Sequence, residues 1–133
     1  KHRVEDALEA VRSAQQEGVH AGGGTSLLRA SESIVTEVDN PTQQRGVEIV
    51  LAAIRAPVRQ ISKNAGESED LVEQKIINSE EGQGYCFDSH DMVDYYSLGV
   101  IDPLKVTRCA LQNAASAAGT LITTNFGIVE KKL

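Results

Sequence analysis

Residues 102–119 read DPLKVTRCALQNAASAAG and contain the strongest helix signal in the chain. An Asp at the N-cap accepts hydrogen bonds from the free amides of a first helical turn, and Pro suits the first helical position because it has no amide hydrogen to satisfy. Asp102 and Pro103 therefore predict a helix start. Small residues recur along the segment and let neighbouring helices approach closely, so we expect a buried central helix in a mainly α fold.

Apolar residues recur at helical spacing upstream of this segment. The expected helices cover residues 4–17, 25–34, 43–64 and 68–77. Pro57 should kink or divide the third helix, because proline removes a backbone donor and clashes with the preceding turn. Short β segments are expected at Tyr85–Asp88 and, from its β-branched composition, at Leu121–Val129. A brief helix is expected between them, from Asp91 to Tyr96.

Composition limits the classes of function. The chain has 133 residues, 41% of them apolar, and a formal net charge of −6, which suits one soluble domain with its own core. A general nucleic-acid binder is excluded because that affinity depends on clustered cations. No apolar run approaches the roughly 20 residues of a membrane span. Cys86 and Cys109 are too few for a disulfide framework and favour a reducing compartment, and no metal site is expected because His and Cys are not at ligand spacing.

Four features could carry chemistry, and each has a simpler structural explanation. The Gly22-Gly23-Gly24 turn before a helix could surround an anion with amides or could only join two helices. Asp102 could bind a ligand or only cap its helix. Asp6 could act in a site or only be solvated on a charged helix face. Cys86 near His90 could be a thiol nucleophile, although no third orienting group is identifiable, or a structural cysteine.

Several strings resemble a known family when they are taken together. They are RVEDAL (residues 3–8), EGVHAGGG (17–24), APVRQI (56–61), DPLKVTR (102–108) and ALQNAAS (110–116). At this spacing they resemble the C-terminal part of group I chaperonins, the GroEL family, and the match is collinear over nearly all of the chain. The resemblance implies that residues 1–18 are the last helix of the intermediate domain. It implies that residues 19–133 are the C-terminal half of the equatorial, ATP-binding domain, a helical bundle.

The resemblance also implies roles for individual residues. Asp6 matches the catalytic carboxylate that orients the water attacking the γ-phosphate, a reaction that depends mostly on positioning and charge stabilisation. The implied nucleotide-binding residues are Gly22, Gly23, Gly24, Cys86, Phe87, Asp88, Val100 and Asp102. Among these, Asp102 matches a position near the ribose. The segment Cys86–Asp88 replaces the Asn-Ala-Ala that the family usually has beside the base, which puts base recognition in doubt.

The implied function is that of an ATP-dependent chaperonin subunit, an ATPase that assists protein folding in a ring. Its cofactors would be ATP and Mg²⁺, with K⁺ as a further candidate. The family's phosphate and magnesium loop, Gly-Asp-Gly-Thr-Thr, has no counterpart in these residues, and the chain begins at Lys1 without a methionine. We therefore expect a segment of a longer chaperonin. The alternative is a non-hydrolysing assembly fragment that retains only ring contacts.

The implied partners follow from the same resemblance. They are identical subunits in a seven-membered ring, single or double, non-native proteins and a co-chaperonin lid, with no nucleic acid and no membrane. The segment Leu121–Val129 would pair as a strand with a neighbouring subunit. The implied location is the cytoplasm, of a bacterium or of a host that carries a virus, with an organellar matrix as the alternative.

Overall fold

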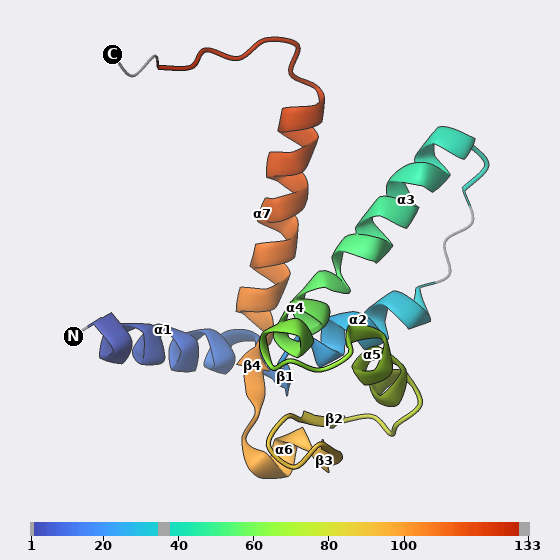
Figure 1. The fold of residues 1–133 in the computed structure, drawn as a ribbon. Helices are drawn as coiled ribbons and strands as arrows, with labels where there is room; N and C mark the ends of the chain where they lie inside the picture. Colours follow the sequence, from blue (N-terminus) through green and yellow to red (C-terminus); the bar gives the residue numbers. More distant parts are fainter. Residues whose placement is uncertain (1, 35–37, 131–133) are drawn as a thin grey trace.

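The computed structural model describes residues 2–34 and 38–130 and has a mainly helical architecture (Figure 1). The helices are α1 (His2–Glu17), α2 (Thr25–Ser33), α3 (Pro41–Ala53), α4 (Ala56–Asn64), α5 (Glu69–Ile77), α6 (Tyr95–Leu98) and α7 (Leu104–Ile122). The strands are β1 (Val19–Ala21), β2 (Gln83–Cys86), β3 (Asp91–Asp94) and β4 (Ile101–Pro103). They form two antiparallel pairs, β1 with β4 and β2 with β3. The predicted mainly α fold class is confirmed.

A small core joins α2, α4, α5 and β2. Its fully buried members are Leu28, Val58, Val72, Ile76 and Tyr85. Val72 and Ile76 are four residues apart on α5, so they share one face of that helix. Each of the four elements contributes at least one of these side chains, and this cluster therefore fixes the body of the molecule.

An ion-pair network reinforces the contact between α4 and α5. Glu73 is buried, and its carboxylate is paired with the guanidinium groups of both Arg55 and Arg59. Arg59 also contacts Glu69 at 3.2 Å and Asp70 at 2.8 Å. A buried charge is tolerated only when it is paired, so the two arginines are required by the burial of Glu73.

The sequence signals for helix ends are largely confirmed. The predicted long helix is divided into α3 and α4, and Pro57 lies in the first turn of α4, where its missing amide hydrogen costs nothing. α3 begins at Pro41, two residues before the predicted start, because the side chain of Asn40 caps it by accepting from the amide of Thr42 at 2.8 Å. Gly66 follows α4 in a left-handed conformation with φ 78°, which is typical of the residue after a helix.

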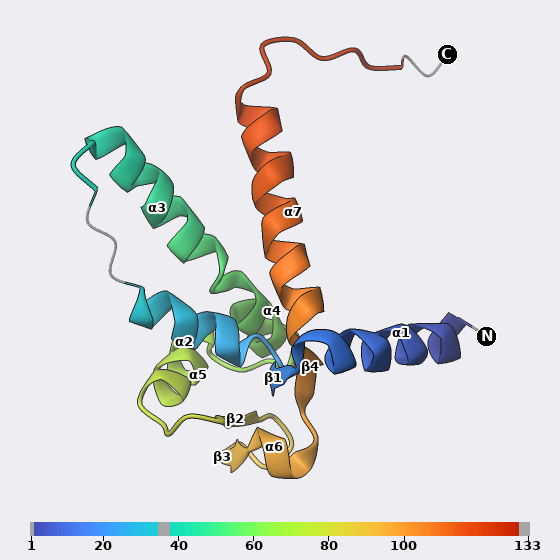
Figure 2. The same ribbon diagram turned by 180° about the vertical axis from the view of Figure 1, so that it is seen from behind.

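The helices α1, α3 and α7 project from the body, and both views show α1 running crosswise to α7 (Figures 1 and 2). The prediction of a buried central helix is wrong for α7, which has no buried residue. Its first turns contact α1 and β4, and the described residues supply no cover for its far end. Among the described residues, no helix combines the length and the apolar character required to cross a membrane.

The β predictions are partly wrong. The segment at Tyr85–Asp88 does contain a strand, but β2 begins earlier, at Gln83, and ends at Cys86. The expected helix at Asp91–Tyr96 is largely β3, because this stretch pairs with β2 across a short turn. The strand predicted at Leu121–Val129 is absent from the described residues: its first two residues complete α7, and residues 124–130 have no regular secondary structure. A β-branched composition makes a strand only where another strand supplies hydrogen bonds, and none of the described residues does so there.

Candidate functional site

Two short strands, β1 and β4, bring distant parts of the chain together. Gly18 ends α1 with a left-handed φ of 83°, which turns the chain into β1. The amide of Leu104 donates to the Gly18 carbonyl at 3.1 Å, and the antiparallel register places His20 opposite Asp102. The end of α1, the glycine turn and the start of α7 therefore meet at this pair of strands (Figure 2).

Gly22 follows β1 and extends the contact. Its amide donates to the carbonyl of Val100 at 2.9 Å. A Cβ atom at Gly22 would lie 3.2 Å from Oδ2 of Asp102 and 3.2 Å from the Val100 carbonyl oxygen. Any larger residue would crowd the Asp102 carboxylate, so glycine keeps this carboxylate approachable. Three predicted site residues, Gly22, Val100 and Asp102, thus lie together.

The next two glycines form a left-handed turn, with φ 62° at Gly23 and 77° at Gly24. A Cβ atom at Gly24 would lie 2.9 Å from the backbone nitrogen of Val58 and 3.1 Å from Cβ of Pro57, so both conformation and space require glycine. Gly24 is the N-cap of α2, and no side chain caps this end. The positive end of the helix dipole therefore has no side-chain partner. The tight-turn and anion-site interpretations are both compatible with this geometry.

Asp102 does not cap α7, and that sequence prediction is wrong. Pro103 occupies the N-cap of α7, and no side chain caps this helix end. Pairing with β1 keeps Asp102 in an extended strand instead. Its half-buried carboxylate lines a cavity of about 480 Å³, which also receives the polar side chains of His20 and Thr107. Most of the remaining lining is apolar and comes from α3, α4 and α7, so the cavity has a polar rim at β1–β4 and an apolar wall.

Cys86 lies at the end of β2 and is half-buried. Hydrogen bonds from the Ser89 side chain, and then from the backbone of Ser89 and Asp88, lower the pKa of the Cys86 thiol. His90, the partner that a thiol nucleophile would need, instead bonds through Nδ1 to Glu67 at 2.6 Å. Nothing in this arrangement orients an imidazole toward Cys86, and it favours the structural interpretation of the cysteine.

Phe87 and Asp88, which follow Cys86, lie in different environments. The ring of Phe87 makes an edge-to-face contact with Tyr85, with 5.1 Å between centroids and 80° between planes. It is half-buried against the main core. Asp88 is exposed. Phe87 is therefore committed to the core, and the groups of this segment that a ligand can reach are its backbone, the Cys86 thiol and the Asp88 carboxylate.

Arg29 ties the helix after the glycine turn to the loop before β2. Its guanidinium donates to the carbonyl and hydroxyl of Ser79, at 3.1 and 2.9 Å. It also donates to the carbonyls of Glu80 and Gln83, at 2.7 and 3.2 Å. One side chain thus fixes where α2 and β2 lie relative to each other.

Asp6 does not join these residues. It is exposed on α1, eleven residues before the helix end at Glu17, which corresponds to about 16 Å at 1.5 Å per residue. Figure 1 shows α1 extending away from the glycine turn. In this conformation the predicted catalytic carboxylate is therefore remote from the other predicted site residues.

Polar contacts hold the C-terminal end of α1 against α7. Arg108 donates to both carboxylate oxygens of Glu17, at 2.9 and 2.6 Å, and Lys105 donates to Gln16. The hydrogen bond from Arg108 lowers the pKa of Glu17 below its ordinary value. Because α1 has no buried residue of its own, these contacts set its direction.

Sequence reasoning missed two residues at the site, His20 and Tyr95. His20 lies opposite Asp102 and bonds through Nε2 to the Thr107 hydroxyl at 2.8 Å. Tyr95 is buried beside Gly23. A capping signal could have located Tyr95, since Asp94 accepts from the amide of Tyr96 at 2.9 Å and starts α6 immediately before the buried ring.

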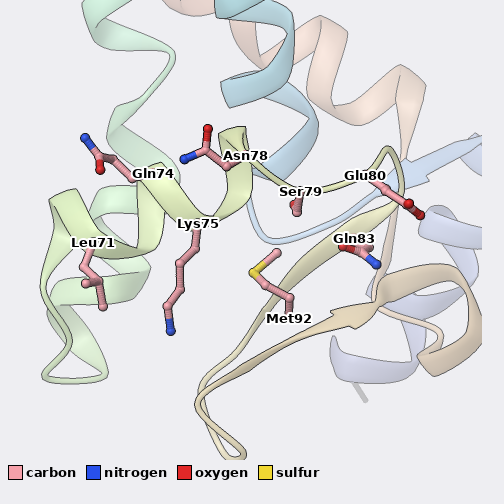
Figure 3. A pocket seen from close by; sticks show the side chains of 8 residues that line it. All are labelled: Leu71, Gln74, Lys75, Asn78, Ser79, Glu80, Gln83 and Met92. Atoms are coloured by element: carbon pink, nitrogen blue, oxygen red, sulfur yellow. The ribbon is translucent and has the colours of Figure 1, made fainter.

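A second hollow, of about 620 Å³, lies between α5 and the β2–β3 hairpin (Figure 3). Its lining includes Gln74, Lys75, Asn78 and Met92 and none of the predicted nucleotide residues. The Lys75 ammonium lies 4.8 Å from the centroid of the Tyr85 ring. This hollow is separate from the glycine turn and Asp102.

The described residues contain no cluster of metal ligands. Across residues 2–34 and 38–130, no group of three or more His, Cys, Asp or Glu side chains is placed to hold a metal ion. The described residues therefore offer no cluster of protein ligands that would hold Mg²⁺ without the phosphates of a nucleotide. At the glycine turn the Cβ positions are bordered by the protein's own atoms, those of Asp102, Tyr95 and Pro57 among them. The fit of the turn to a nucleotide therefore depends on its backbone amides and on the uncapped start of α2.

Comparison with protein families agrees with the strings quoted above. The sequence matches the TCP-1/cpn60 chaperonin family over residues 1–132. The match extends through α1, both β pairs, the glycine turn and α7, so it includes every element that carries a predicted site residue. The chain belongs to the TCP-1/cpn60 chaperonin family.

Proposed function

We propose that this chain is part of a group I chaperonin that binds and hydrolyses ATP to drive the folding of other proteins. Family membership implies ATP-dependent assisted folding. The assignment to group I rests on the resemblance of strings such as RVEDAL and DPLKVTR. In this proposal residues 1–18 end the intermediate domain, and residues 19–133 form the C-terminal half of the equatorial domain.

The observation that supports the proposal most is the meeting of Gly22, Val100 and Asp102 at the β1–β4 pair. Gly23 and Gly24 would present backbone amides to the nucleotide at the uncapped start of α2. The Asp102 carboxylate would accept hydrogen bonds from ribose hydroxyls. These donors and acceptors are of the right kind for a nucleotide.

The base end of the nucleotide would meet the segment from Cys86 to Asp88. Phe87 is turned into the core, so it would support the segment instead of stacking on the base. Asp88 and the Cys86 thiol replace an amide-bearing side chain of the family at this place. We therefore propose that base contacts here are made by the backbone and by these two polar groups.

Asp6 would act as the catalytic carboxylate after α1 moves. Gly18 joins α1 to the site with φ 83°, and a Cβ atom there would meet nothing within 4 Å. Rotation at this residue requires that the contacts of Gln16 and Glu17 with α7 break. Rotation about Gly18 would bring Asp6 toward a bound triphosphate. A carboxylate delivered in this way orients the attacking water and makes hydrolysis depend on the position of a helix.

Further parts of the proposal rest on the resemblance alone. They are a seven-membered ring, single or double, a co-chaperonin lid and non-native proteins as substrates. Mg²⁺ and K⁺ would be bound by the phosphate-binding half of the domain, whose Gly-Asp-Gly-Thr-Thr loop is not among these 133 residues. The proposed location is the cytoplasm, of a bacterium or of a virus-carrying host, or an organellar matrix.

The test compares ATP binding with ATP turnover in the complete protein that contains these residues. Asp6→Ala should retain the ATP dissociation constant within about threefold and lower kcat by at least about 100-fold, the range typical of a lost catalytic group. Glu5→Ala is the matched control, since Glu5 is an exposed carboxylate next to Asp6 on α1. An equal loss of binding and turnover in Asp6→Ala would contradict the assigned role.

The intact mass of the protein purified from its source separates the two functional interpretations. A mass well above 14.3 kDa with ATPase activity supports the folding machine. A mass near 14.3 kDa would overturn hydrolysis by this chain alone and favour a non-hydrolysing assembly fragment.

A further inference from the structure

Tyr95 occupies an unusual place between two segments of the proposed nucleotide site. It is the first residue of α6, and only 6% of it is exposed. Nevertheless, Tyr95 does not belong to the main core cluster around Leu28 and Val72. Its burial therefore has another cause, its contacts with glycines of two other segments.

The ring of Tyr95 lies against two glycines from different parts of the chain. A Cβ atom at Gly84 in β2 would come within 2.2 Å of Cε2 of the Tyr95 ring, so only glycine fits there. A Cβ atom at Gly23 would lie 3.5 Å from Cε2 and 3.6 Å from the hydroxyl oxygen of Tyr95. The aromatic ring is therefore the spacer between the glycine turn and β2.

The hydroxyl of Tyr95 adds a directional contact. It donates to the carbonyl of Tyr85 at 2.7 Å, and this hydrogen bond is buried. Burial raises the pKa of Tyr95, which keeps the phenol protonated and able to donate. A buried carbonyl without a partner is unfavourable, so this bond holds the peptide that joins Tyr85 to Cys86 in one orientation.

We propose that Tyr95 is a positioning residue for the nucleotide, because its ring and hydroxyl fix the distance between Gly23 and the segment Cys86–Asp88. This inference rests on the proposed function, in which the phosphate end of the nucleotide meets the glycine turn and the base end meets Cys86–Asp88. Loss of the hydroxyl frees the Tyr85–Cys86 peptide while the ring still separates the two segments. Loss of the hydroxyl therefore weakens recognition of the adenosine part of the nucleotide.

The test uses calorimetric titration of the complete protein with ATP, ADP and tripolyphosphate, together with steady-state ATPase kinetics. Tyr95→Phe should raise the dissociation constants for ATP and ADP by about three- to tenfold, the effect of one neutral hydrogen bond. The affinity for tripolyphosphate should stay within twofold, and kcat at saturating ATP should also stay within twofold. Tyr96→Phe is the matched control, because Tyr96 is the exposed neighbour on the same short helix and should bind all three ligands like the wild type.

The outcomes distinguish the inference from the function on which it rests. A lower melting temperature in Tyr95→Phe with unchanged ATP affinity would show a purely structural residue and overturn the inference. Equal losses for ATP and tripolyphosphate would do the same. Failure of the wild-type protein to bind ATP would overturn the proposed function itself.

A measurement on the unmodified protein covers the case in which Tyr95→Phe does not fold. Binding of ADP should slow amide hydrogen exchange in β2 and in α6 together, because Tyr95 couples the two elements. Slower exchange in residues 22–24 without any change in α6 would overturn the inference.

Discussion

Gly84 lets the Tyr95 ring pack against β2 because glycine has no Cβ atom. The Tyr95 ring fills the space where a Cβ atom would stand, with three ring atoms within 2.6 Å of it. Gly84→Ala should therefore lower the free energy of unfolding by about 1–3 kcal/mol, the usual effect of overpacking. Urea denaturation of the complete protein, followed by a spectroscopic signal of subunit unfolding, measures this change in free energy.

Gly46 provides the matched control. It lies exposed inside α3, and a Cβ atom there would meet nothing within 4 Å. Gly46→Ala should raise the free energy of unfolding by about 0.5–1 kcal/mol, because alanine is the better helix former. Equal effects of the two substitutions would mean that Tyr95 does not pack on Gly84 as the structure has it.

Asp102 marks the limit of sequence reasoning at this scale. An Asp before a Pro is a strong capping signal, and the helix does begin close to the predicted place, at Leu104. The carboxylate is nevertheless not the cap, because β4 pairs with β1 and keeps residues 101–103 extended. Local preference was overridden by a contact with a segment far away in the chain, which no local pattern contains.

At the scale of elements, the position of α1 should depend on pH. The pKa of Glu17 is lowered from 4.5 by its hydrogen bond with Arg108, so the contact between α1 and α7 is present above this ordinary value. It is lost as the pH falls through the lowered value and the carboxylate becomes protonated. Amide protection factors in α1, measured by hydrogen exchange with mass spectrometry, should therefore fall between about pH 5 and pH 3.

Two variants test whether the carboxylate of Glu17 is responsible. Glu17→Gln should show low protection of α1 at both pH values, because the charge is absent throughout. Glu9→Gln should behave like the wild type, since Glu9 pairs with Arg12 inside α1 and does not attach the helix to α7. A pH dependence that persists in Glu17→Gln would assign the effect to another group.

The helices could be predicted from sequence and the strand pairs only in part. Periodic apolar residues, Pro57 and Gly66 indicate where the helical segments begin and end, and these signals act within one or two turns. The strands β1 and β4 have three residues each, which is too short for a detectable alternation. Their pairing depends on the turn at Gly18, and the register that places His20 opposite Asp102 follows only from the fold.

The candidate site could be predicted by resemblance and not by local pattern. Three glycines in a row are compatible with an ordinary turn, and family strings were needed to suggest a nucleotide. Tyr95 was missed because the segment before it is a strand that was predicted as a helix. Its partners, Gly23 and Gly84, lie in other elements, so its role depends on three segments that meet only in the folded chain.

At the scale of the whole molecule, large apolar surfaces have no partner among the described residues. The core joins only α2, α4, α5 and β2, whereas α7 has no buried residue. The segment after α7 carries large apolar side chains that are almost fully exposed, with Phe126 at 91% and Ile128 at 105% of full exposure. A soluble protein rarely leaves so much contiguous apolar surface in water. The family implies a ring of subunits, and we expect a neighbouring subunit to cover this segment.

Ile128→Lys tests whether the segment after α7 lies in a contact between subunits. Since Ile128 is exposed in the subunit, the substitution should leave the subunit's helical content unchanged. In a ring, where we expect a neighbour to bury this residue, the unpaired charge should cost several kcal/mol and shift the protein toward smaller species in sedimentation velocity. Gln43→Lys adds the same charge at an exposed position in the first turn of α3 and should assemble normally. If both variants formed the wild-type oligomer, the segment after α7 would not lie in a subunit contact, and the apolar faces of α3 and α7 would have to account for assembly.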